Sequence, residues 1–84
     1  MENRIGTIII GIGNRAEAPH VNEIISKHSK IIIGRLGLPR NEGMSLINLV
    51  VEGTTDEIGS LTGQLGKLEG IEVKSAVLKL AISR

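Results

Sequence analysis

Residues 8–16 read IIIGIGNRA, and the residues after this stretch decide which fold it belongs to. An apolar strand that leads into Gly11-x-Gly13-x-x-Ala16 is how a dinucleotide-binding strand-turn-helix unit begins. Such a unit needs an acidic residue about 20 residues further on, where it holds a ribose hydroxyl. Residues 31–35 read IIIGR at that place, without an acid, and no second mononucleotide-binding half comes after them. The sequence therefore argues against a dinucleotide site.

The composition indicates one small domain, residues 1–84, with an aliphatic core. The chain has 84 residues and no Phe, Trp or Tyr, so its core must be built from Ile, Leu, Val, Ala and Met. Aliphatic cores of this size often depend on a partner chain. The formal net charge is only +1, and there is no aromatic ring on which a base could stack. Direct nucleic-acid binding is not expected.

Cysteine usage and the N-terminal residues predict a cytoplasmic protein. The chain has no Cys, which excludes a disulfide framework, a thiolate zinc site and a cysteine nucleophile. The opening residues, MENRIGTIII, carry an acidic Glu2 and no small-residue cleavage site, unlike a signal peptide. No apolar run approaches the ~20 residues that span a bilayer. No membrane association is expected.

Four segments rich in Ile and Val predict strands, at residues 4–12, 30–38, 45–52 and 71–82. A helix is predicted between the first two strands, over residues 16–29, with Pro19 in its first turn. The link LPRNEGM, residues 38–44, is rich in turn-forming residues and favours a hairpin between the second and third strands.

The second helix has a stronger signal at its start. Thr54 and Glu57 have the spacing of a capping box, and Gly70 is predicted to end the helix. Its apolar stripe is formed by Ile58, Leu61, Leu65 and Leu68. The resulting order, βαββαβ, is the ferredoxin-like motif of the α+β class: a four-stranded antiparallel sheet with two helices on one face.

Three apolar runs, residues 8–10, 31–33 and 49–51, break the alternation expected of a sheet with one face in water. One such run is common in a central strand, but three in one small sheet indicate that both faces are covered. We therefore expect a homo-oligomer, a dimer or tetramer, in which another copy covers the sheet face or a sheet edge.

The segments RIGTIIIGI, VNEII, IIIGRLGLP and LINLVVEGTTDEIGSLTGQLGKLEGIEVKSAV closely resemble the small regulators associated with iron-only hydrogenase systems. The resemblance runs from about Arg4 to Val77, and residues 33–39 and 51–58 are its most specific parts. It implies an ACT-like, ferredoxin-like βαββαβ sandwich, similar to the C-terminal domain of nickel-responsive repressors. It also implies an oligomeric regulator that is not an enzyme.

Two departures from the nickel repressors limit what is carried over. Those proteins have a DNA-binding ribbon-helix-helix arm before the ligand domain, whereas the first strand here begins almost at Met1. Their metal sites are rich in His and use a Cys, whereas this chain has only His20 and His28. Eight residues apart, these two are separated by about 80° and about 12 Å along a helix, so they cannot close one site by themselves. The alternative is a site completed by a second chain's ligands across an oligomer interface. No metal or cofactor is expected.

The turn after the first strand is the first candidate binding site. In the simpler interpretation, Gly11 and Gly13 let the chain turn tightly and Asn14 tolerates a left-handed backbone. In the alternative, free backbone N–H groups here receive an anionic or zwitterionic small molecule. ACT-like domains, which the chain resembles, place effectors near this turn, often against a neighbouring subunit. The expected ligand-binding residues are then Gly11, Gly13, Asn14 and Arg15.

The second strand contributes Gly34, Arg35 and Gly37. Glycine inside a strand often marks a bulge or a close backbone approach. A subunit contact is the favoured interpretation, and a gap that faces a ligand is the alternative. The guanidinium group of Arg35 could hold a carboxylate or phosphate.

No catalytic residues are expected. Asp56 and Glu57 are explained by capping and the helix dipole, and the serines show no nucleophile motif. Acylphosphatases share this size and topology and use a loop arginine and a strand asparagine, which Arg15 and Asn48 could mimic. The extended signature around that arginine is missing here.

The leading hypothesis is a homo-oligomeric ACT-like regulator that works by protein association, by sensing a small effector, or by both. The alternative is a structural or partner-binding accessory protein without a ligand site.

Overall fold

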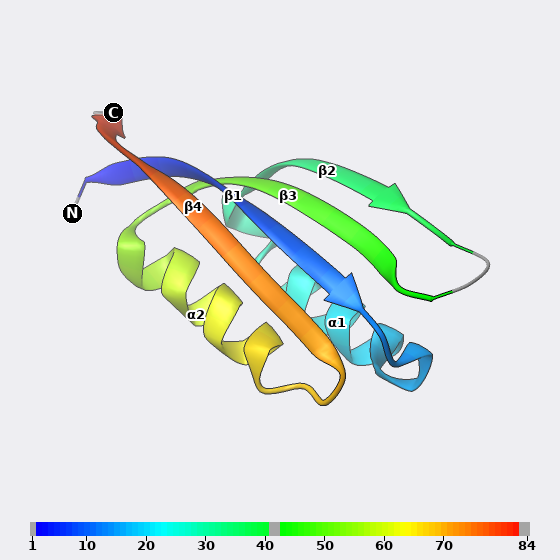
Figure 1. The fold of residues 1–84 in the computed structure, drawn as a ribbon. Helices are drawn as coiled ribbons and strands as arrows, with labels where there is room; N and C mark the ends of the chain where they lie inside the picture. Colours follow the sequence, from blue (N-terminus) through cyan, green and yellow to red (C-terminus); the bar gives the residue numbers. More distant parts are fainter. Residues whose placement is uncertain (1, 41–42, 83–84) are drawn as a thin grey trace.

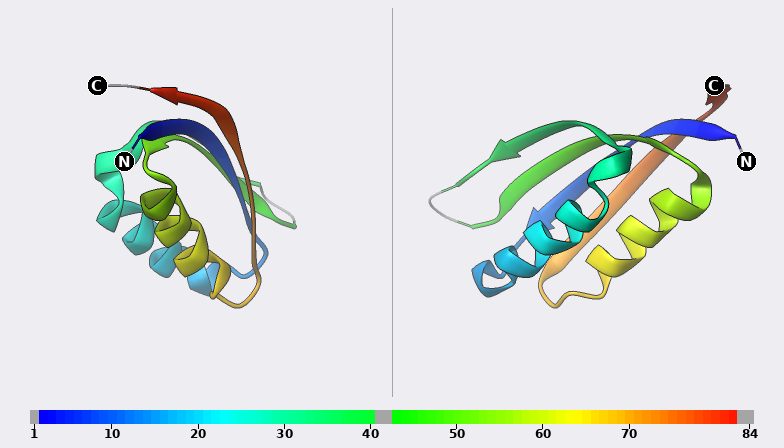
Figure 2. Two further views of the ribbon diagram at one scale, coloured as in Figure 1. Left: turned by 90° about the vertical axis from the view of Figure 1, so that its left-hand side faces the viewer. Right: turned by 180° about the vertical axis from the view of Figure 1, so that it is seen from behind.

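The computed structural model describes residues 2–40 and 43–82. Its elements are β1 (Asn3–Ile12), the 3-10 turn η1 (Arg15–Glu17), α1 (Ala18–Lys27), the 3-10 turn η2 (Ser29–Ile31), β2 (Ile32–Leu38), β3 (Ser45–Gly53), α2 (Thr55–Gly66) and β4 (Ile71–Ile82). The four strands form one antiparallel sheet in the order β2-β3-β1-β4. Both helices lie on the same face of it (Figure 1 and Figure 2). The predicted ferredoxin-like fold is confirmed.

The predicted boundaries of the first helix are too wide. Residues 15–17 and 29–31 form separate 3-10 turns, and only Ala18–Lys27 is α-helical, with Pro19 in the first turn. The side chain of Asn14 accepts a hydrogen bond from the Ala16 N–H and so starts the first turn. The link to β3 joins an antiparallel pair, as predicted for a hairpin, although Asn41 and Glu42 lie outside the described residues.

The capping box of α2 is confirmed at its N-terminus. The Glu57 N–H donates to the Thr54 hydroxyl at 3.1 Å, and the Thr54 N–H donates to the Glu57 carboxylate at 2.9 Å. The predicted end is wrong, because the helix stops at Gly66 and Lys67 is its C-cap. Gly70 instead takes a positive φ of 75° in the turn that leads to β4, a conformation that favours glycine.

The hydrophobic core lies between the helices and one face of the sheet. Among the residues whose burial the structure describes, its twelve members are all aliphatic: Ile8, Ile10, Ile12, Val21, Ile25, Ile31, Ile47, Leu49, Val51, Ile58, Leu61 and Leu65. Each apolar run divides between core and surface. Ile8 and Ile10 are fully buried while Ile9 between them is 47% exposed, and Val50 is exposed between two buried neighbours. The sheet is therefore apolar on both faces, as the runs predicted.

Candidate functional site

The face of the sheet away from the helices, here called the open face, is not covered by any described element. On β1 and β3 its members alternate with the buried core residues. They are Thr7, Ile9 and Gly11 on β1, Leu46, Asn48 and Val50 on β3, Leu36 and Leu38 on β2, and Glu72, Lys74 and Ala76 on β4. The face is thus mostly aliphatic, with its charged groups along the β4 side.

A polar pair lies inside this apolar face. The Thr7 hydroxyl donates to the Asn48 side-chain oxygen at 2.9 Å, joining neighbouring strands β1 and β3. Both side chains are only half-buried. The hydrogen bond satisfies two groups that would be costly to bury unpaired if another molecule covered the face.

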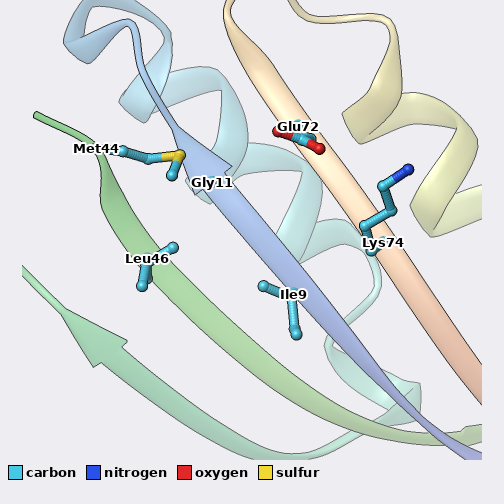
Figure 3. A pocket seen from close by; sticks show the side chains of 6 residues that line it. All are labelled: Ile9, Gly11, Met44, Leu46, Glu72 and Lys74. Atoms are coloured by element: carbon cyan, nitrogen blue, oxygen red, sulfur yellow. The ribbon is translucent and has the colours of Figure 1, made fainter.

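A hollow of about 200 Å³ lies on the open face above the end of β1. Figure 3 shows its lining residues, which come from β1, β3 and β4 and from the residue just before β3: Ile9, Gly11, Met44, Leu46, Glu72 and Lys74. The Met44 side chain reaches over Gly11, so that a Cβ at position 11 would lie 2.5 Å from the Met44 sulfur. Gly11 is therefore part of a strand and leaves room for a neighbouring side chain. One wall of the hollow is apolar and the other is charged.

Two more hollows continue along the open face. One, of about 190 Å³, is lined by Leu36, Leu38, Leu46 and Asn48, among others. The other, of about 300 Å³, lies towards the opposite end of β1, beside Ile5, Thr7, Val50, Ala76 and Leu78. The open face is therefore an uneven apolar surface that a complementary surface could fill.

Three backbone N–H groups of the turn between β1 and α1 have acceptors within the chain. The Gly13 N–H donates to the Gly70 carbonyl at 2.9 Å, the Ala16 N–H to the Asn14 side chain at 3.1 Å, and the Glu17 N–H to the Asn14 carbonyl at 3.0 Å. Neither Gly11 nor Gly13 has a positive φ, and Asn14 has φ −120°. The left-handed backbone expected at Asn14 is therefore wrong, and Gly11 lies within β1 and not in the turn. A Cβ at position 13 would lie 3.2 Å from the Gly70 oxygen, a close contact that glycine avoids.

The remaining expected ligand residues are Arg15 in the same turn and Gly34, Arg35 and Gly37 on β2. Arg15 is exposed and donates to the Arg40 carbonyl at 3.0 Å, which joins this turn to the β2–β3 link. Gly34 faces Val50 on the open face, next to a bulge in the β2–β3 pairing, whereas the Cβ position of Gly37 meets no atom within 4 Å. Arg35 donates to the Asn22 side chain of α1 at 3.1 Å.

The structure therefore divides the expected ligand residues into two groups. Gly11, Gly13, Asn14 and Arg15 lie at the end of β1, and Gly34, Arg35 and Gly37 lie along β2. Strand β3 separates β1 from β2, and two strand spacings amount to about 10 Å. None of the three hollows described above is lined by residues of both groups.

The two histidines have structural partners. His20 is exposed and pairs with the Glu17 carboxylate. His28 contacts the Ile24 carbonyl at 2.7 Å and the Ser60 hydroxyl at 3.2 Å, and so links α1 to α2. Within residues 2–40 and 43–82, no group of three or more His, Asp or Glu side chains is placed to hold a metal ion.

Sequence reasoning missed the hollow over Gly11. The spacing of Glu72 and Lys74 in a predicted strand was a sufficient signal that they share one face. The position of Met44 over Gly11 carried no such signal, because it depends on how β1 and β3 are aligned.

Among the described residues, no helix is long and apolar enough to cross a membrane. The order of the strands, the two helices on one face and the apolar open face define an ACT-like domain of the ferredoxin-like class. Residues 4–75 match the model of the TM1266-like family, described as "Iron-only hydrogenase system regulator, putative". The chain belongs to this family.

A solved structure agrees with this assignment. The uncharacterized protein TM1266 from Thermotoga maritima is 38% identical, with a TM-score of 0.86 over 93% of this chain and 100% of that one. No curated protein matches the chain.

Two more distant structures share the fold. The ACT domain of GTP pyrophosphokinase from Chlorobium tepidum has a TM-score of 0.72 at 22% identity, over 90% of this chain and 100% of that one. CPII from Thiomonas intermedia, a nitrogen regulatory PII-like protein solved with ADP, AMP and bicarbonate, has a TM-score of 0.53 at 17% identity. The alignment with CPII covers 98% of this chain and 94% of that one. Family and fold together indicate a regulatory protein.

Proposed function

We propose that this chain is a cytoplasmic, one-domain regulator of an iron-only hydrogenase system that works by association of its own copies and by binding a small effector. The observation that carries the proposal is the open face, where large aliphatic side chains of β1, β2 and β3 lie uncovered. Ile9, Leu36 and Leu38 are 47%, 60% and 50% exposed. Contiguous apolar surfaces of this kind mark interaction sites.

The size of the open face suits a contact between two copies. Four strands about 4.8 Å apart and about 9 residues long cover roughly 19 by 30 Å, or about 570 Å². Two such faces would bury about 1,100 Å² in total, close to the lower limit of a specific interface.

The proposed effector site is the end of β1, from Gly11 to Arg15, together with the adjoining hollow. Its class is a small anionic or zwitterionic molecule, because Lys74 and Glu72 lie on the charged wall and Arg15 is close by in sequence. A ligand here would touch the contact between copies and would shift their association only if it binds the free and associated states with different affinity. On β2, Gly34, Arg35 and Gly37 are assigned to a contact between copies.

The association is tested by size-exclusion chromatography with light scattering at micromolar concentration. The expected mass is a multiple of the 9.0 kDa chain. Ile9→Asp should dissociate it, because the substitution places a charge in the middle of the open face. Gln64→Asp, on the exposed side of α2, is the matched control and should leave the mass unchanged. A stable monomer of the parent chain would contradict the proposal.

A partner-binding accessory protein without an effector is the second candidate. It is favoured by the turn at Gly13, Ala16 and Glu17, whose N–H groups already have acceptors within the chain. A thermal-shift screen of amino acids, nucleotides and metal ions separates the two functions. A ligand at 100 times its Kd should add about 2.7 kcal/mol to the free energy of unfolding. A uniformly negative screen would favour the accessory role.

A further inference from the structure

The two edges of the sheet differ in their protection against pairing with another strand. The β2 edge is 7 residues long, is interrupted by a bulge between Ile32 and Gly34, and is followed by Pro39. The β4 edge is 12 residues long and contains neither Gly nor Pro. Short, bulged edges with Gly and Pro resist pairing, whereas long regular edges accept another strand. The β2 edge has this protection near its start, whereas the β4 edge pairs regularly with β1 from Ile71 to Val77 and its pairing shifts only beyond that point.

The charges on β4 provide a means of recognising a partner strand. Glu72 and Lys74 lie on the open face of β4, where they are paired in register with Gly11 and Ile9 of β1. Both side chains are exposed, and within the described part of the chain neither forms a salt bridge. On a second β4 strand that runs antiparallel, the same two charges occur in the reverse order. Each negative charge can then lie opposite a positive charge of the other strand.

We propose that β4 pairs antiparallel with β4 of a second copy, about a two-fold axis through Val73, to give a continuous eight-stranded sheet. In this register Glu72 of each copy lies opposite Lys74 of the other copy, so the contact contains two cross-strand ion pairs. A two-fold axis perpendicular to the sheet also keeps the helices of both copies on the same side.

Neighbouring registers lack this complementarity. An axis through Glu72 or through Lys74 places like charges directly opposite each other, which destabilises a strand pair. An axis through Ser75 places each Lys74 opposite Ala76 and pairs no charges. The charge pattern of β4 therefore selects the register at Val73 among those that keep the helices on one side.

The helix side of the same segment is suited to this contact. Ile71 and Val73 are half-buried and pack against the core of their own copy. In the proposed register Val73 meets Val73 of the second copy, and Ile71 meets Ser75. The two aliphatic cores would then continue across the boundary.

The regular part of β4 ends where the strand pairing with β1 changes. The register shifts between Arg4 and Gly6, and the Arg4 guanidinium donates to the Lys79 carbonyl at 2.6 Å and to the Leu78 carbonyl at 3.4 Å. Irregular pairing of this kind bends and twists a strand. It restricts the straight edge to the first part of β4, where the two charges lie.

The edge contact rests on the proposed function, because it is too small to hold two copies alone. Residues 71–75 span roughly 17 Å of strand, well short of the area of a specific interface. The open face must supply the rest through a different two-fold axis. Two perpendicular two-fold contacts generate a tetramer with dihedral symmetry.

Introduced cysteines test the register, since the chain has no Cys of its own. Glu72→Cys and Lys74→Cys variants are mixed and oxidised, and disulfide-linked dimers are counted by mass on non-reducing gels. Residues directly opposite each other have Cα atoms about 4.5–5.5 Å apart, which a disulfide can span. The expected result is a dimer that joins one copy of each variant.

A mixture of Glu72→Cys with Ala76→Cys is the matched control, because these positions face each other only in the register centred on Lys74. No rapid crosslink is expected. A stronger crosslink in this control would overturn the proposed register. No crosslink in either mixture, with an oligomeric parent that Ile9→Asp dissociates, would overturn the edge contact and leave the proposed function intact. A monomeric parent would overturn both.

Charge reversal gives a second readout that needs no oxidation. Glu72→Lys should weaken the edge contact by about fivefold or more, because two ion pairs become repulsive. The double variant Glu72→Lys/Lys74→Glu should restore the parent's dissociation constant. Equal dissociation constants for the parent and Glu72→Lys would contradict the proposal.

Discussion

Both faces of the sheet carry the same types of aliphatic residue, but these are buried on one face and exposed on the other. On the helix side, Ile8, Ile10 and Leu49 are fully buried beneath α1 and α2. On the open face, Ile9 and Val50 come from the same runs and remain exposed. Aliphatic content alone therefore does not distinguish a folding core from a contact surface. What distinguishes them is which face the helices cover.

The largest effect should come from truncation on the covered face. Leu61 of α2 is fully buried, and Leu61→Ala should lower the free energy of unfolding by about 3 kcal/mol, because it removes buried methyl groups and leaves a cavity. Leu36→Ala on the open face should cost less than about 0.5 kcal/mol in dilute protein and should weaken association instead. Chemical denaturation and light scattering measure the two effects. Equal losses of stability would show that the faces do not differ in this way.

Two glycines on β1 provide a finer comparison. A Cβ at Gly6 would lie 2.8 Å from the Ala76 carbonyl oxygen, so Gly6→Ala must move the backbone of β4. We expect a loss of about 2 kcal/mol. At Gly11 the obstacle is the exposed Met44 side chain, which can swing away. Gly11→Ala should therefore cost less than about 1 kcal/mol, by denaturant titration. A larger loss at Gly11 would mean that Met44 is held in place.

The α2 capping box predicts a pH-dependent effect on the covered side. Hydrogen bonds from the Thr54 backbone N–H and side chain lower the pKa of Glu57 below its ordinary value. A lowered pKa in the folded state gives stability that is present above the unfolded pKa, about 4.3, and is lost as the pH falls through the folded value. Thr54→Ala should cost about 1 kcal/mol at pH 7. The loss should shrink at pH 3, as measured by urea denaturation. A loss that is the same at both pH values would argue against the role of Glu57.

The smallest effect in dilute protein is expected at the polar pair of the open face. Thr7→Val removes the donor to Asn48, and in a monomer water replaces it, so stability should change by about 0.5 kcal/mol or less. If another copy covers this face, the unpaired Asn48 side-chain amide would be buried and would weaken association. The double variant Thr7→Val/Asn48→Leu should recover it, because both polar groups are gone. Dilution experiments by light scattering measure the difference. If Thr7→Val leaves the dissociation constant unchanged, the pair is not part of the contact.

Local signals in the sequence predicted most of the fold. The capping box depends on Thr54 and Glu57, three residues apart, and it was found as predicted. The strands and their order followed from short Ile- and Val-rich runs. The helix ends were wrong where backbone hydrogen bonding stops the helix earlier than the side-chain pattern does, at Lys27 and Gly66.

The candidate site was less predictable. The pattern at Gly11 and Gly13 suggested an open turn with free N–H groups, but the N–H of Gly13 is bonded to Gly70, which lies far away in the sequence. Arg35 was a candidate ligand group and instead reaches Asn22 on α1. In both cases the partner comes from another element, so the contact has no local signature.

The sequence by itself determined the type and order of the elements, because strand and helix periods and helix caps act over a few neighbouring residues. It also carried the resemblance that the family match confirms. Only the tertiary structure decided which residues of each run are covered, that Met44 lies over Gly11, and that β4 keeps a free edge. These features depend on the alignment of strands that are distant in the chain, and a shift of one residue would reverse every side chain between the two faces.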